Sequence, residues 1–462
     1  MKNDLTEGNI LKKLVILALP IMGTSLIQMA YNLTDMIWIG VLGSRAVTAI
    51  GTAGFFTWLA FAFIIVPKIG AEVGVAQSVG RRNKEETKSY IRHSIQMNVV
   101  LAVIYGAAVM VCRKQLIGFF NIAGDDINGM AASYLLIVSM GMVFFFLPPV
   151  LTAIFNGHGD SRTPFIINTI GLMVNIMLDP LLILGLGPFP QMGVAGAAVA
   201  TIFAQFVVTM VFIFVIRKKT DFFNAVNFLQ KPNWRHIGRI VRFGVPVALQ
   251  SGAFTVIAMI IARILSGWGS TPIAVQSVGS QIESISWMTA GGFQTALSAF
   301  VGQNYGAKKW ERIYRGYFTA IGMIAVIGII TSCLLIFLPG PIFSIFIREQ
   351  NVIQDGMIYL RILGVSQLFM CIEITTAGAF NGLGKTVPPS IVGIALNAMR
   401  IPGALLLSIA LGLNGVWWSI SLSSILKGVI LTSWFIIFLS RHPEIRGRRF
   451  IDFKKLEVEA ER

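Results

Sequence analysis

Two aspartates, an asparagine and a threonine inside long apolar runs are the residues of this chain best suited to binding a cation. They are Asp35, Asn175, Asp179 and Thr201. Asp35, Asp179 and Thr201 each lie eight residues from a glycine expected to mark a helix end. At about 1.5 Å of rise per residue, all three side chains come to roughly 12 Å from those ends. The spacing therefore predicts one polar cluster shared by three helices.

The residue types in this cluster suit a hard cation or a proton. Asn175 and Asp179 are four residues apart and so project from one face of a helix. Carboxylate, carboxamide and hydroxyl oxygens suit Na⁺, while two close carboxylates in a low dielectric repel each other and favour binding of a proton. Pro180 has no N–H and is expected to bend the helix beside the cluster. A polar cluster that only bonds helices together is the alternative.

Four further charged residues fall inside apolar runs, where charge is costly and usually functional. Glu283 and Glu373 could pair with Arg400 or face a cationic substrate. Glu72, near the end of its run, is expected to make a helix-terminal or gating contact. We expect Arg400 to be the only basic residue well inside a span.

The composition indicates that these residues belong to a membrane protein. Only 13% of residues are charged and 55% are hydrophobic, with a mean hydropathy of +0.75, whereas a soluble domain carries about 25% charged residues. Lysine and arginine outnumber aspartate and glutamate by 37 to 21. We attribute this surplus to orientation in the membrane and expect no nucleic-acid partner. A soluble enzyme and a disordered chain also fit poorly.

Cysteine and histidine offer little material for catalysis. The three cysteines and four histidines are isolated, without CxxC or HExxH spacing. Gly382–Thr386 looks like the end of a phosphate-binding loop, but Ala379 stands where that loop requires glycine. We therefore expect no enzyme, no ATP-driven mechanism, and no cofactor other than a coupling ion.

The apolar runs predict an all-α membrane protein with about twelve spanning helices, each of which needs roughly 20 residues. A helix satisfies its backbone hydrogen bonds internally, as a bilayer requires. The expected spans are 12–42, 46–79, 90–112, 130–155, 164–187, 192–216, 240–266, 271–302, 314–338, 356–380, 387–411 and 414–440.

Basic residues gather in alternate connections between these spans. Connections at 81–88, 217–221 and 307–312 and the tail at 441–462 are rich in lysine and arginine, whereas those at 187–191, 267–271 and 412–415 carry almost none. By the positive-inside rule, both termini are expected on the cytoplasmic side of the cell membrane.

An internal repeat divides the chain into two halves. Pro246 follows Pro20 by 226 residues, and the same offset relates Gly269 to Gly43 and Gly306 to Gly80. Later motifs match at offsets of 225 and 222, as Asn397 does with Asn175. Six helices separate equivalent positions, so both halves should enter the membrane in the same direction, related by a pseudo-two-fold axis along the membrane normal.

The expected domains follow from the repeat. We expect an N-lobe of six helices at 1–216, a cytoplasmic linker at 217–239, a C-lobe of six helices at 240–440 and a basic tail at 441–462. Parallel repeats of this kind are typical of transporters with alternating access. The cation cluster is not repeated, since Ile261 and Ile401 replace Asp35 and Asp179.

These motifs together resemble the multidrug and toxic compound extrusion (MATE) family. The resemblance rests on Pro20 followed by Asn32–Asp35, on Gln77–Arg81 and its partner Gly302–Gly306, and on Asn175 with Asp179–Pro180. The paired turns Asn156–Asp160 and Asn381–Lys385 complete it. It covers about residues 10–440.

The resemblance implies export of amphipathic, often cationic, small molecules against inward flow of Na⁺ or H⁺, with Asp35, Asn175, Asp179 and Thr201 as the cation site. We expect cation binding to bend the first helix near Pro20, and a monomer among membrane lipids. One branch of the family has a glutamate soon after the proline of the seventh span, whereas the stretch from Pro246 to Ile257 contains no acid here. A flippase for a lipid or lipid-linked precursor is the alternative, and it predicts a strongly basic cavity.

Overall fold

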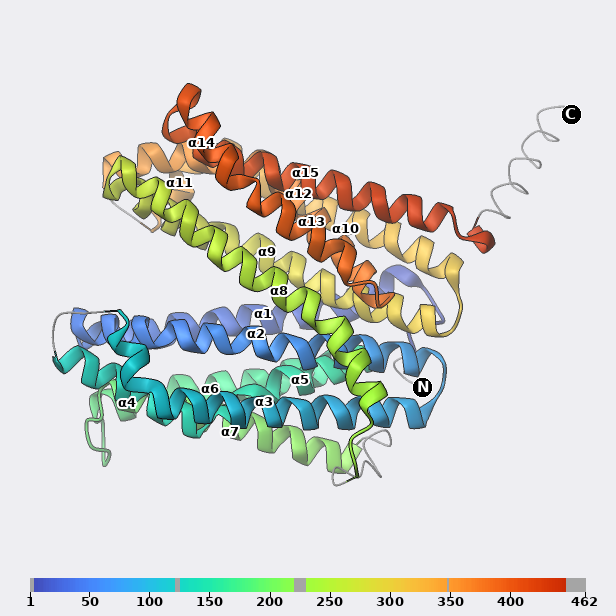
Figure 1. Ribbon diagram of the computed structural model, residues 1–462, viewed down its shortest axis with the longest axis horizontal. Coiled ribbons are helices and arrows are strands. Elements are labelled where there is room, and N and C mark those ends of the chain that lie inside the picture. Colours follow the sequence, from blue (N-terminus) through green and yellow to red (C-terminus); the bar gives the residue numbers. More distant parts are fainter. Residues whose placement is uncertain (1–3, 121–124, 220–229, 347–348, 446–462) are drawn as a thin grey trace, which may run out of the picture. The chain divides into compact units, whose positions relative to one another are not determined.

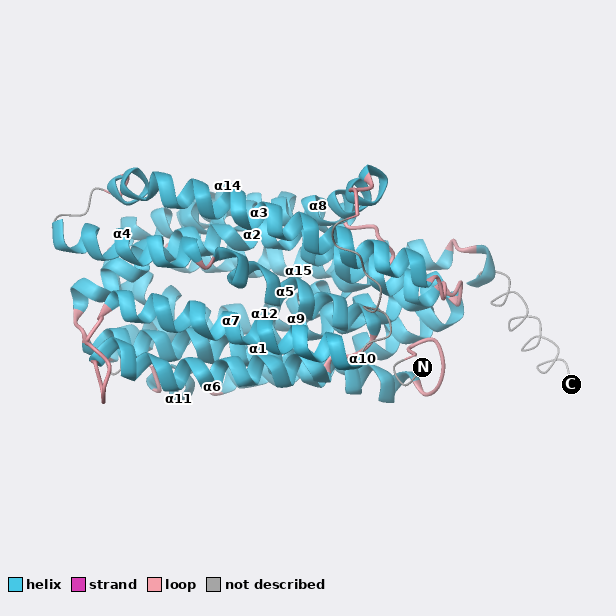
Figure 2. Cartoon of the chain, turned by 90° about the horizontal axis from the view of Figure 1, so that it is seen from below, coloured by secondary structure: helices cyan, strands magenta, loops and turns pink. Residues whose placement is uncertain are grey.

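The computed structural model describes residues 4–120, 125–219, 230–346 and 349–445, and this part of the chain is helical, with no strand (Figures 1 and 2). The helices of the first half are α1 Ile10–Val41, α2 Ser44–Gly80, α3 Lys84–Gly118, α4 Asp125–Met140, α5 Met142–His158, α6 Arg162–Leu184 and α7 Val194–Lys219. Those of the second half are α8 Trp234–Leu265, η1 Ser266–Trp268, α9 Ser270–Gly306, α10 Trp310–Phe337, α11 Pro339–Ser344, α12 Gln350–Gly382, α13 Val387–Ala398, α14 Arg400–Leu411 and α15 Leu413–Ser440.

The helices account for the expected spans, with three differences. Ten spans among the described residues are long and apolar enough to cross a membrane, and α4 with α5 adds an eleventh that bends by 56°. The twelfth expected span is α9, a 37-residue helix whose polar residues, Glu283 among them, keep it out of that set. The expected span 387–411 is divided into α13 and α14 at Met399.

The chain forms two compact units, each described here by itself. The first-half unit comprises Leu19–Ala248, and the second-half unit comprises Met1–Ala18 and Leu249–Arg462. The unit boundaries differ from the expected lobe boundaries, because α1 and α8 each begin in one unit and continue in the other. The boundary between the units falls within two residues of Pro20 in α1 and within two residues of Pro246 in α8, and these prolines are equivalent in the repeat. Most of the expected basic tail lies outside the described residues.

The repeat predicted from the sequence is present in the backbone of the two units. Arg82 and Lys308, 226 residues apart, have φ values of 57° and 58°, which non-glycine residues rarely adopt. Each stands in the turn that follows a 37-residue helix, α2 or α9. The turn at Gly159 likewise matches that at Gly384, with φ values of 93° and 73°.

Close helix packing repeats as well. A side chain at Gly157 of α5 would meet the backbone oxygen of Glu72 in α2 at 2.6 Å. Its counterpart Gly382 in α12 would meet the backbone oxygen of Ser298 in α9 at 2.5 Å. Equivalent glycines therefore allow equivalent helix pairs to approach closely in both units.

Two groups of helices build the first-half unit. Helix α2 packs against α3, α4 and α5, helix α7 packs against α4 and α5, and all of these helices share the large apolar core of the unit. Helices α6 and α7 pack against each other, and the part of α1 beyond residue 18 joins them through Tyr31, Leu172 and Ala204. This second group carries all four residues of the expected cation site.

Candidate functional site

The structure brings Asp35, Asn175, Asp179 and Thr201 together inside the first-half unit. Asn175 Nδ2 donates to Asp179 Oδ1 at 3.1 Å, and Thr201 Oγ1 donates to Asp35 Oδ2 at 3.4 Å. Asp35 and Asp179 also interact electrostatically. Asn175 and Asp179 are fully buried, whereas Asp35 and Thr201 are partly exposed. One site therefore draws side chains from α1, α6 and α7.

Three oxygen atoms of this cluster are buried and accept no hydrogen bond from the described residues. They are Asp35 Oδ1, Asn175 Oδ1 and Asp179 Oδ2. Buried polar atoms are ordinarily hydrogen-bonded, and an unpaired buried carboxylate is especially costly. Converging oxygens of this kind fit a hard cation such as Na⁺, and the two carboxylates equally fit a shared proton.

Tyrosine side chains complete the surroundings of the cluster and were missed by the reasoning from sequence. Tyr31 lies one turn before Asp35 on α1, and both Tyr31 and Tyr134 interact electrostatically with the two aspartates. Gly171 of α6 makes room for Tyr31, because a side chain there would meet the phenol oxygen at 2.7 Å. The four-residue spacing of Tyr31 and Asp35 was the available signal.

The second-half unit has isoleucines at the positions that match the two aspartates, although Asn397 keeps the position of Asn175. Ile257 and Ile261 of α8 pack with Ala404 and Val416 in a small hydrophobic core. Ile257 takes the place of Tyr31, and Ile261 that of Asp35, at the 226-residue offset. This unit therefore has no counterpart of the aspartate pair at these positions.

A buried ion pair in the second-half unit corrects the expectation that Arg400 would be the only basic residue well inside a span. Lys427 of α15 lies 3.1 Å from a carboxylate oxygen of Glu373 in α12, and both side chains are buried. The first-half unit also has Lys68 within α2. A lone lysine hardly lowers the mean hydropathy of a long apolar run, which is why both were overlooked.

Arg400 and Glu283 lie near this ion pair. Arg400 Nε donates to Ser423 Oγ at 2.6 Å, and its Nη2 donates to Ser424 Oγ at 3.1 Å. Glu283 interacts electrostatically with Arg400 and lies near Tyr359. Glu373 therefore pairs directly with Lys427, a partner other than the expected Arg400, while Glu283 interacts electrostatically with Arg400. Contact with substrate stays a prediction.

Glu72, Pro20 and Pro180 are the remaining residues singled out from the sequence, and they lie inside α2, α1 and α6. Glu72 is buried in α2 where Gly157 of α5 packs against its backbone, so it lies at a contact between helices. Pro20 and Pro180 both stand inside continuous helices, α1 and α6. The bending of those helices stays a prediction.

Comparison with known proteins identifies the family. A family model described as MatE matches this chain twice, over residues 20–181 and 246–406, in agreement with the internal repeat. The probable multidrug resistance protein NorM of Thermotoga maritima is 30% identical over 429 residues, covering 92% of each chain. An FAD transporter of Shewanella oneidensis is 24% identical over 442 residues, covering 93% of this chain and 95% of that one.

Solved structures agree with this assignment at the level of fold. An outward-facing multidrug resistance MATE family transporter matches with a TM-score of 0.87 and 23% identity, covering 95% of this chain and 98% of that one. A MATE structure in complex with MaD3S matches with a TM-score of 0.89, the same identity and the same coverage. Family and fold thus lead to one conclusion: the chain is a multi-pass membrane protein that belongs to the MATE family of transporters.

Proposed function

We propose that this transporter exports amphipathic, often cationic, organic compounds from the cytoplasm in exchange for Na⁺ or H⁺ entering through the first-half unit. The observation that carries the proposal is the group of three buried oxygens on Asp35, Asn175 and Asp179 that lack hydrogen-bond partners among the described residues. The Thermotoga relative is a probable multidrug resistance protein, and this similarity supports the choice of cargo.

The chemistry follows from the cost of buried charge. Two carboxylates in a low-dielectric interior repel each other, and a bound cation or proton relieves that repulsion. Asn175 orients Asp179 through its amide, and Thr201 orients Asp35 through its hydroxyl. Asp35 is on the same helix as Pro20, where α1 passes from one unit to the other. Neutralising the cluster is proposed to change the bend of α1 there and so release the cargo outward.

Export of a lipid-linked precursor is less well supported. Such a cargo would need a strongly basic cavity for its phosphate groups. Lys427 is already neutralised by Glu373, and Arg400 donates to two serine hydroxyls and interacts electrostatically with the carboxylates of Glu373 and Glu283. Neither cation is left uncompensated for a phosphate.

Efflux of a fluorescent organic cation from cells tests the proposal. Asp35→Asn removes one charge with little change of shape and is expected to reduce gradient-dependent efflux to that of cells without the transporter. Asp160→Asn is the matched control, because Asp160 accepts hydrogen bonds from Thr163 at the start of α6, a role that asparagine also fills. Normal efflux by Asp35→Asn at equal expression would remove the proposed role.

A further inference from the structure

A polar cavity lies at one end of the first-half unit, outside the cation site. Its volume is about 590 Å³, and it is formed by the start of α3 and by the start of α8 with the residues just before it. The cavity is lined by Asn83, Glu85, Glu86, Lys88, Ser89, Arg92, Gln230, Arg235, His236 and Arg239. Four of these side chains are cationic and two are anionic.

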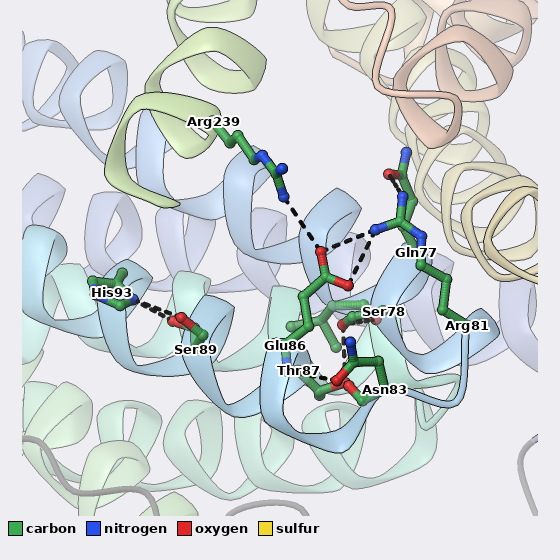
Figure 3. Close-up of polar contacts among 10 residues, drawn as sticks. Gln77, Ser78, Arg81, Asn83, Glu86, Thr87, Ser89, His93 and Arg239 are labelled. Atoms are coloured by element: carbon green, nitrogen blue, oxygen red, sulfur yellow. Dashed lines mark hydrogen bonds and ion pairs between the residues drawn. The ribbon is translucent and has the colours of Figure 1, made fainter. Parts of the chain in front are cut away.

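Both carboxylates of the cavity are already neutralised. Glu86 contacts Arg81 at 2.9 Å and Arg239 at 3.4 Å, and Figure 3 shows these two arginines approaching it from opposite sides. Glu85 lies 2.9 Å from Lys88. Neighbouring basic side chains therefore neutralise both carboxylates of the cavity.

The remaining cations have no carboxylate partner among the described residues. Among the described residues, Arg92 donates to the neutral side chain of Gln230, and its Nε is buried without a hydrogen-bond partner. No carboxylate lies within ion-pair distance of Arg235 in the described part of the chain. Nδ1 of His236 is likewise buried and unpaired. Two guanidinium groups and a ring nitrogen thus remain available to an anion.

Hydrogen bonds hold the walls of the cavity in place. His93 Nδ1 donates to Ser89 O at 2.6 Å, and its Nε2 accepts from the backbone N–H of Asn233 at 2.8 Å, just before α8 begins. The His93 ring also stacks on His236, with centroids 5.5 Å apart and an interplanar angle of 8°. His93 therefore connects α3 to the start of α8 through a hydrogen bond and a ring contact.

Two helix N-termini contribute to the same cavity. Helix α3 is 35 residues long and starts after the cap Asn83, which accepts from Glu86 N. Helix α8 is 32 residues long and starts at Trp234. The N-terminus of a helix carries partial positive charge and attracts anions, phosphate in particular.

The depth of the cavity favours a ligand from the lipid phase. Both α3 and α8 are membrane-spanning helices by length and composition, so their first turns belong near the membrane surface. Trp234, the first residue of α8, is 78% exposed, and exposed tryptophans are enriched at the membrane–water interface. We propose that this cavity binds the phosphate group of an anionic phospholipid, with Arg92 and Arg235 as its two guanidinium contacts. This site is separate from the exchange of cations.

Lipid binding to the purified full-length protein tests the proposal. Delipidated protein in mild detergent would be titrated with phosphatidylglycerol, with phosphatidylcholine and with inorganic phosphate, while bound lipid is counted by native mass spectrometry and thermal stability is followed. The wild type is expected to bind phosphatidylglycerol preferentially. Arg92→Gln with Arg235→Gln should weaken that binding about tenfold or more. Tenfold in affinity corresponds to about 1.4 kcal/mol, which the loss of even one charged hydrogen bond can account for.

A charge-matched variant separates the cavity from general surface charge. Arg162→Gln with Arg217→Gln removes two exposed arginines from other helices of the same unit and should bind like the wild type. If the double cavity variant unfolds, Arg235→Gln alone carries the test, because its side chain is exposed. Equal loss in both double variants would overturn the site. Stabilisation by inorganic phosphate as strong as that by phosphatidylglycerol would assign it to a soluble phosphate and overturn the lipid.

Discussion

At the scale of single residues, the two halves of the chain use buried charge in different ways. Asp35 and Asp179 lie together with no cationic side chain bonded to either in the described structure. Glu373, in contrast, has a lysine at 3.1 Å. A carboxylate already neutralised by lysine has little need of a mobile cation, whereas an unneutralised pair does. The asymmetry therefore supports the proposal that the coupling ion binds in the first-half unit.

The Glu373–Lys427 pair is expected to be structural, with its stability measurable by mutation. Removing one partner leaves an unpaired buried charge, so Lys427→Met should lower the free energy of unfolding by about 3–5 kcal/mol. Adding Glu373→Gln to that variant should recover much of the loss, because the second charge is then removed as well. Thermal unfolding of the single and double variants in detergent measures both changes. Independent, additive losses would show that the two side chains do not interact.

At the scale of helices, glycines set which pairs pack closely. Gly157 and Gly382 are equivalent in the repeat, and each faces the backbone of the neighbouring helix at less than 3 Å from an added side-chain carbon. The neighbours, Glu72 and Ser298, are also equivalent at the 226-residue offset. The contact is thus a property of the repeat and does not depend on the neighbour's side chain.

Gly157→Ala is expected to destabilise the protein, because the backbone oxygen of Glu72 cannot move aside as a flexible side chain would. Overpacking of this kind costs about 1–3 kcal/mol. Gly129→Ala is the matched control, since an added side-chain carbon there meets nothing within 4 Å, and alanine in a helix should be neutral or stabilising by about 0.5–1 kcal/mol. Unfolding temperatures compare the two. A Gly157→Ala variant as stable as Gly129→Ala would contradict the packing.

Hydropathy predicted the spans but not their breaks. Two breaks were not predicted: the bend between α4 and α5 and the division at Met399. Such breaks depend on how each segment packs against its neighbours, which the apolar content of a segment does not indicate. The change of unit within α1 and α8 is also absent from any composition pattern. Pro20 and Pro246 do mark the places, and their equivalence in the repeat was visible from the sequence.

At the scale of the whole molecule, the distribution of charge predicts the orientation in the membrane. The connections at 81–88 and 307–312 are basic, and that at 187–191 carries no charge. In a variant with Cys112, Cys333 and Cys371 replaced by serine, a membrane-impermeant thiol reagent should label Gln191→Cys in intact cells. It should label Lys308→Cys only after permeabilisation. The reverse pattern would place the basic connections outside.

The grouping of Asp35, Asn175, Asp179 and Thr201 could be largely predicted from the sequence, and the Glu373–Lys427 ion pair could not. Few acids lie inside apolar helices, and Asp35 and Asp179 were expected at a common depth, so both could be recognised as site candidates. The repeat showed that isoleucines replace them in the second half. Lys427 and Glu373 lie on helices far apart along the chain, and only folding reveals that they meet. The tyrosines around the site were hidden among many other aromatic residues.

Transport into reconstituted vesicles tests most directly whether the aspartate cluster couples cation entry to export. Vesicles with an imposed Na⁺ gradient or an imposed pH gradient, each applied alone, would be supplied with a fluorescent organic cation. The wild type should concentrate it under at least one gradient, and Asp179→Asn should not, while Asp160→Asn behaves as the wild type. Uphill accumulation by Asp179→Asn, or none by the wild type under either gradient, would contradict the account.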